Sequence, residues 1–149
     1  MAETSPHRLA PDRMVGIAAT FSKTVAESDI YLLAGVLGEF DPLHVDEEYC
    51  KTTPYGRRIA QGALIVGFMM SAAALAAAKV DAVLPSLGLD RVRHTGPVFI
   101  GDTVRVTYVI ERFDEERARG YANVVATNQK GETVAVATHL FKVLEATPA

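Results

Sequence analysis

The sequence is poor in cysteine: Cys50 is the single one among 149 residues, so no disulfide can form within the chain. Such scarcity is typical of proteins in a reducing compartment, and we expect Cys50 to be a small buried side chain. The first residues, MAETSPHRLAPDRMV, also lack the apolar stretch of a secretory signal. We therefore expect a cytoplasmic protein in which residues 1–13 form a flexible N-terminal arm.

The chain also lacks a strong excess of charge of either sign, with 15 Lys and Arg against 18 Asp and Glu. This balance gives no overall attraction for nucleic acid or anionic lipid. The sequence has no glycine-rich phosphate loop and no aromatic platform for stacking bases. His94, His139 and Cys50 lack the spacing of metal ligands. We expect no nucleic-acid partner, no membrane partner and no metal.

A hydrophobic run long enough to cross a membrane is missing as well. The longest candidate, ALIVGFMMSAAALAAA at 63–78, falls short of the ~20 apolar residues that a span requires, and Lys79 and Asp81 follow it. A helix that is apolar on all sides is more simply one buried inside a folded domain. The sequence therefore predicts a long central helix from Gln61 to about Val80.

Helical or irregular patterns dominate up to about Pro85, and strand patterns follow. We expect a first strand at 14–23, a helix at 26–36 closed by Gly38, and an irregular excursion at 38–60 with one helical turn at 46–51. Loops of this length inside a domain are usually functional. Four strand candidates span 88–95, 103–113, 119–128 and 132–143. The short turns between them predict antiparallel pairing of consecutive strands, and a sheet that hides the apolar helix gives an α+β fold.

Residues 38–44, GEFDPLH, place two carboxylates and an imidazole around Pro42. A loop with no chemical role could be built from Gly, Asn, Asp and Pro alone. A carboxylate and an imidazole can hold one water molecule between them, and a turn at Pro42 lets Glu39 and His44 face one point. His44 as an ordinary loop histidine, and Asp41 as an alternative carboxylate or a group that shapes the loop, stay open alternatives.

The segment GEFDPLHVDEEYCKTTPYGRRIAQGAL, followed by an alanine-rich helix, resembles the MaoC-like dehydratases, the (R)-specific enoyl-CoA hydratase branch of the hot-dog fold. The later stretches PVFIGDTVRV and NQKGETVAVAT are similar to the strand pattern of the same family, so the resemblance covers roughly 15–144. It implies a single hot-dog domain at 14–145, with an antiparallel sheet wrapped around a long central helix, and a C-terminal tail at 146–149.

Carried over position by position, the family's catalytic acid falls on Glu39, its Asn on Asp41, its His on His44 and its helix-opening glycine on Gly62. The chain departs from the family pattern with Glu39 for Asp, Asp41 for Asn and Gln61 for His. Glu is longer than Asp by one methylene, and a displacement of about 1 Å in a reacting group can lower a rate ~100-fold.

The resemblance implies reversible hydration of trans-2-enoyl-CoA to (R)-3-hydroxyacyl-CoA, which makes the protein a hydro-lyase. Glu39 and His44 would act on one water, and the backbone N–H of Gly62, at the positive end of a helix, would bind the thioester oxygen. Gly62 as nothing more than a helix cap is the alternative. No cofactor is expected beyond the coenzyme A moiety of the substrate. The residues expected to bind substrate are Asp41, Tyr55, Gly56, Arg57 and Arg58.

Arg57 and Arg58 could contact the phosphates of coenzyme A, or belong to a solvated face. Two other functions stay open: an acyl-CoA thioesterase on the same fold, or an acyl-CoA-binding subunit without activity. Hot-dog sheets usually pair edge to edge, and an unprotected sheet edge seeks a partner. We therefore expect a homodimer or a higher homo-oligomer.

Overall fold

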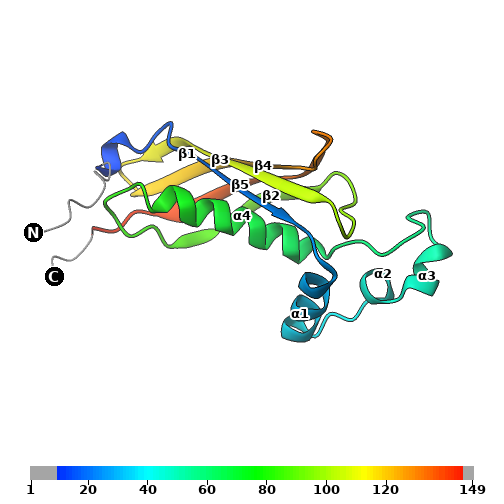
Figure 1. The fold of residues 1–149 in the computed structure, drawn as a ribbon. Helices are drawn as coiled ribbons and strands as arrows, with labels where there is room; N and C mark the ends of the chain where they lie inside the picture. Colours follow the sequence, from blue (N-terminus) through cyan, green and yellow to red (C-terminus); the bar gives the residue numbers. More distant parts are fainter. Residues whose placement is uncertain (1–9, 146–149) are drawn as a thin grey trace, which may run out of the picture.

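The computed structural model describes residues 10–145 (Figure 1). It begins with a 3-10 helix, Pro11–Arg13, so the last part of the expected arm has regular structure. Residues 1–9 of that arm and the expected tail at 146–149 lie outside the described residues. In the part that is described, every helix falls short of the length and apolar character needed to cross a membrane.

A five-stranded antiparallel sheet forms the main layer, in the spatial order β1-β3-β4-β5-β2. Its strands are β1 Ala18–Thr24, β2 Ser86–His94, β3 Thr103–Asp114, β4 Arg119–Thr127 and β5 Thr133–Lys142. All five were expected from the sequence, and their bounds differ by a few residues at most ends. In β3 the side chains alternate between core and outer face, because Val104, Val106, Tyr108 and Ile110 are buried.

One pairing differs from the expectation for consecutive strands, because β2 pairs with β5 and not with β3. Residues 95–102 do not form a hairpin turn. Their backbone bonds elsewhere: Val98 O accepts from Ala60 N at 2.7 Å, and Gly101 N donates to Val25 O at 2.8 Å. These bonds draw the chain away from β2, so that β3 joins the sheet beside β1 and β2 becomes an edge strand.

The central helix α4, Gly62–Ala77, lies across one face of the sheet (Figure 1). Its inner face is buried, and Phe68 packs its ring 5.4 Å from that of Phe21 in β1. The expectation that the helix is buried on every side is wrong for the single chain, because the sheet covers one side and Leu75 is 47% exposed on the other. The α+β hot-dog architecture, an antiparallel sheet folded around a long helix, is confirmed.

Three helices lie between β1 and α4, at one end of α4 (Figure 1): α1 Glu27–Leu37, and, within the excursion expected at 38–60, α2 Pro42–Val45 and α3 Glu47–Lys51. Helix α1 ends as expected at Gly38, whose φ of 73° is left-handed. Arg58 connects α1 with α3, because it donates hydrogen bonds to Glu27 at 2.6 Å and to Glu47 at 2.8 Å. This brace fixes α1 and α3 around α2.

Candidate active site

The short helix α2 is stabilised at its start by two residues, Asp41 and Pro42. Asp41 is the N-cap, and its Oδ1 accepts a hydrogen bond from Leu43 N at 2.9 Å. Pro42 occupies the first helical position, where its missing N–H leaves no intrahelical bond unmade. This turn was expected as a simple bend at Pro42, and it carries His44 inward, with 8% of that residue exposed.

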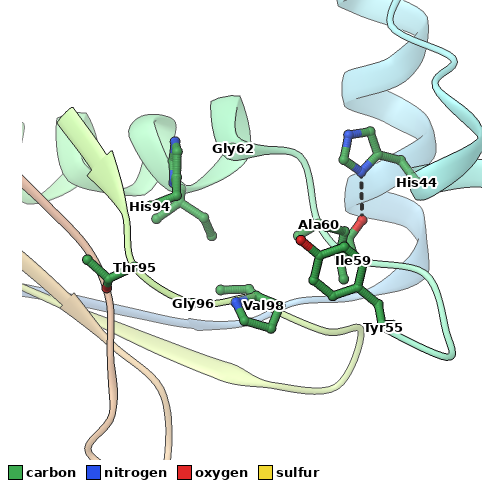
Figure 2. Close-up of a pocket in the computed structure, with 11 residues that line it drawn as sticks. His44, Tyr55, Ile59, Ala60, Gly62, His94, Thr95, Gly96 and Val98 are labelled. Carbon is green, nitrogen blue, oxygen red and sulfur yellow. Dashed lines mark hydrogen bonds between the residues drawn. The ribbon is translucent and has the colours of Figure 1, made fainter. Parts of the chain in front are cut away.

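The His44 ring is held by the backbone of the loop that leads to α4. Its Nδ1 lies 2.8 Å from the carbonyl oxygen of Ile59 (Figure 2). A carbonyl oxygen can accept but cannot donate, so Nδ1 carries the hydrogen and Nε2 is the nitrogen that is free to react. In neutral His44, Nε2 is therefore a proton acceptor.

Cys50 contacts the backbone of α2. Its thiol donates to Leu43 O at 3.3 Å and its side chain is fully buried, which confirms the expectation for this residue. Burial is the first cause that raises the pKa of the Cys50 thiol, and nearby Glu47 adds to it. The thiol therefore stays protonated and acts here as a packing and hydrogen-bonding group.

A cavity of about 400 Å³ opens between α2, the start of α4 and residues 94–98 (Figure 2). Three of the predicted site residues line it: His44, Tyr55 and Gly62. The wall opposite His44 comes from the end of β2 and the segment that follows it, including His94. The structure thus brings an imidazole and a helix N-terminus to one hollow.

Gly62 is the first residue of α4, where backbone N–H groups lack partners within the helix and carry partial positive charge. A Cβ atom at this position would lie 2.7 Å from Nε2 of His94, closer than real Cβ atoms come, so any other residue here would displace the His94 ring. The preceding residue, Gln61, is buried and donates from Nε2 to Ile30 O at 3.0 Å. Gln61 thereby fixes the start of α4 against α1.

Glu39 lies close to His44 but not within hydrogen-bonding distance. Its Oε1 is 3.9 Å from Nε2 of His44, and its side chain is 44% exposed. Glu39 is not among the residues that line the cavity. A single water at about 2.8 Å from each atom can bridge such a pair, because both atoms accept hydrogen bonds and a water molecule has two hydrogens to donate.

The remaining predicted substrate residues lie outside this cavity. Asp41 is used as the helix cap, and Gly56 supplies a turn with a φ of 71°. Arg57 stacks over the ring of Phe99, 4.0 Å from its centroid, in a neighbouring hollow that shares residues 95–97 with the cavity. Arg58 is 14% exposed and bound to Glu47 and Glu27, whose hydrogen bonds raise the pKa of its guanidinium.

No pattern in the sequence marks His94 as a site residue, because it is a single histidine within a strand candidate. A second cavity, of about 320 Å³, was also missed; it lies along the other half of α4 and is mostly apolar, with His139 in its wall.

Within residues 10–145, no three His, Cys, Asp or Glu side chains gather in a way that could hold a metal ion.

The model of the family described as MaoC like domain matches residues 13–136. An (R)-specific enoyl-CoA hydratase of Rhodospirillum rubrum is 39% identical over 99 residues, which cover 64% of this chain and 64% of that protein. A 3-hydroxybutyryl-CoA dehydratase of Methylorubrum extorquens is 31% identical over 127 residues, covering 83% of this chain and 75% of that protein.

Among solved structures, the unliganded R-hydratase PhaJ1 of Pseudomonas aeruginosa superimposes with a TM-score of 0.76 and 29% identity, over 89% of this chain and 83% of that chain. The match to the family model extends from the 3-10 helix into β5, so it includes the whole excursion that carries His44 as well as α4. The chain therefore belongs to the family of MaoC-like domains.

Proposed function

We propose that this chain is a hydro-lyase that reversibly hydrates trans-2-enoyl-CoA to (R)-3-hydroxyacyl-CoA. The observation that carries the proposal is the shared cavity of His44 and Gly62, with the Glu39 carboxylate 3.9 Å from Nε2 of His44. Two relatives, at 39% and 31% identity, are named as a hydratase and a dehydratase of such thioesters.

In this proposal Glu39 and His44 act on one water molecule. The pair takes a proton from the water as its oxygen bonds to C3, and the electron pair of the double bond moves through C2 to the thioester oxygen. The pair then returns a proton to C2, and both groups regain their starting states. Because Nδ1 of His44 is committed to Ile59, proton exchange at His44 takes place at Nε2.

Besides proton transfer, the reaction requires stabilisation of the charge that develops on the thioester oxygen, and Gly62 supplies it. Its N–H lies at the N-terminus of a 16-residue helix that opens onto the cavity. A preorganised backbone donor of this kind lowers a barrier by about 3 kcal/mol. The absence of a side chain at Gly62 lets the thioester approach the backbone closely.

For the rest of the substrate, Arg57 is the residue best placed to contact a coenzyme A phosphate, because its hollow adjoins the cavity through residues 95–97. Coenzyme A, as part of the substrate, is then the whole cofactor requirement. A homodimer belongs to the same proposal, supported by edge strand β2 and by the exposed Leu75 on the outer face of α4. A cytoplasmic location rests on the single buried free cysteine.

The test is the decrease of enoyl absorbance when the purified protein is mixed with crotonyl-CoA. His44→Ala and His44→Asn should both abolish it; the Asn variant keeps a donor near the Nδ1 position and lacks a basic nitrogen at the Nε2 position. Activity that survives in either variant would contradict the role of Nε2. Release of free thiol by the unmodified protein would instead identify a thioesterase, and saturable binding without either reaction would identify a binding subunit.

A further inference from the structure

The ring of His94, the last residue of β2, faces the start of α4. A Cβ atom built on Gly62 would lie 2.7 Å from Nε2 of His94, with the adjacent ring carbons slightly farther, at 3.1 and 3.2 Å. The corner of the ring that carries Nε2 is therefore the part closest to Gly62. Figure 2 shows the ring beside the first turn of the helix, on the opposite side of the pocket from His44.

His94 differs from His44 and His139 in its hydrogen bonding. Ring nitrogens of His44 and His139 make hydrogen bonds to other residues, whereas neither nitrogen of His94 bonds to any residue in the described part of the chain. His94 lines the cavity and belongs to the exposed residues of β2. Its capacity to donate a hydrogen bond is therefore available to a molecule in the cavity.

Helix geometry indicates where an oxygen bound to the Gly62 N–H would lie relative to His94. At the first residue of a helix, the N–H bond and the Cα–Cβ direction both tilt toward the helix N-terminus. An oxygen that accepts a hydrogen bond from Gly62 N–H therefore lies beside the space that a Cβ atom would occupy. That same space is the one that Nε2 of His94 faces.

We propose that His94 is a second hydrogen-bond donor to the thioester oxygen held by the Gly62 N–H. The inference rests on the hydration reaction proposed above. In neutral His94 with its hydrogen on Nε2, the ring donates without transferring a proton, so the step needs no further acid or base. Two donors share the charge that develops on the oxygen, and the contact strengthens as the enolate forms.

A purely structural role predicts different behaviour, because a ring that merely fills space beside glycine can be replaced by phenylalanine. In His94→Phe we expect kcat for crotonyl-CoA to fall by about 10- to 100-fold, with KM changed less than about twofold, because the lost bond forms mainly in the transition state. His94→Gln, which restores an N–H donor, should recover part of kcat. Asp90→Asn, on the same strand and outside the cavity, should behave as the unmodified protein.

A second measurement needs no substitution. In the unmodified protein, the 15N resonance of His94 Nε2 should shift on saturation with butyryl-CoA, a saturated thioester that cannot be hydrated. An unmoved resonance would overturn the inference, as would a folded His94→Phe variant with unchanged kcat or with an effect confined to KM. If the unmodified protein fails to hydrate any enoyl-CoA, the proposed function and this inference fall together; if it does so and His94→Phe is equally active, the role of His94 alone is lost.

Discussion

Nδ1 of His139 lies 2.7 Å from the hydroxyl oxygen of Tyr108. On its other side, Nε2 lies 2.9 Å from Oγ of Ser86, so the ring links three strands of the sheet, β2, β3 and β5. His139 is 3% exposed, and burial lowers its pKa to about 4. Burial likewise raises the pKa of Tyr108. Both side chains are therefore uncharged at neutral pH.

The pKa of His139 gives the fold a specific sensitivity to acid. The unfolded chain, with a histidine pKa near 6.5, binds more protons than the folded chain between pH 6.5 and 4. The contribution of His139 to stability is thus complete above about pH 6.5 and is lost as the pH falls toward 4, by about 2–3 kcal/mol. His139→Gln should flatten this part of the profile. Urea unfolding at pH 7 and pH 4.5 measures it, and parallel profiles for the two proteins would refute the assignment.

Gly62→Ala should lower hydratase activity more than it lowers stability. Its methyl group would lie 2.7 Å from Nε2 of His94, and the exposed ring can swing aside at little cost. The methyl group and the displaced ring then occupy the space beside the Gly62 N–H, and we expect a loss of about 100-fold in kcat/KM. Gly35→Ala in α1, where a Cβ meets nothing within 4 Å, is the control. It should raise stability by up to about 1 kcal/mol and leave activity intact.

Glu39→Gln separates chemistry from folding. The side chain is 44% exposed and its Oε1 is 3.9 Å from Nε2 of His44, so the neutral amide should leave the melting temperature unchanged. Loss of the carboxylate should lower kcat by about 100-fold or more if Glu39 is the base. Glu39→Asp, which shortens the side chain, should retain more activity than the Gln variant. Equal activity of Glu39→Gln and the unmodified protein would exclude Glu39 as the base.

Asp41 should respond in the opposite way, because its Oδ1 already accepts from Leu43 N and caps α2. Asp41→Asn keeps an oxygen in this position and should preserve both stability and most activity. Asp41→Ala should lower stability by about 1 kcal/mol and reduce activity through a loosened α2. Thermal unfolding together with crotonyl-CoA turnover of both variants makes the comparison. A large loss of turnover in the stable Asn variant would show that the second carboxylate takes part in the chemistry.

The elements that the sequence predicted well are those whose signals are local. Alternation in β3, the apolar run of α4 and the glycine at position 38 each reflect neighbouring residues on one element. The pairing of β2 with β5 escaped prediction, because it depends on bonds that Val98 and Gly101 make to distant segments. Contacts across the fold, and not composition, decide where residues 95–102 run.

In the candidate site, too, the residues with local sequence signals were predicted and those that depend on contacts between distant segments were not. The heptapeptide at 38–44 and Gly62 stand out in the sequence because each combines unusual residue types within a short stretch. Arg58 was expected at the substrate, but Glu27 and Glu47, brought in by two other helices, take up its guanidinium. His94 and Gly62 are far apart in the sequence, and the fold of the sheet brings them together. No local sequence pattern predicts a contact of this kind.

The anchor of His44 has a consequence for how this protein tolerates genetic variation. The acceptor is the main-chain carbonyl at Ile59, which all twenty residue types possess. Point mutations at position 59 can therefore exchange the side chain without removing the group that aims the imidazole. Inserting or deleting a single residue between 52 and 60 would shift that carbonyl instead, so the vulnerable property of this loop is its length.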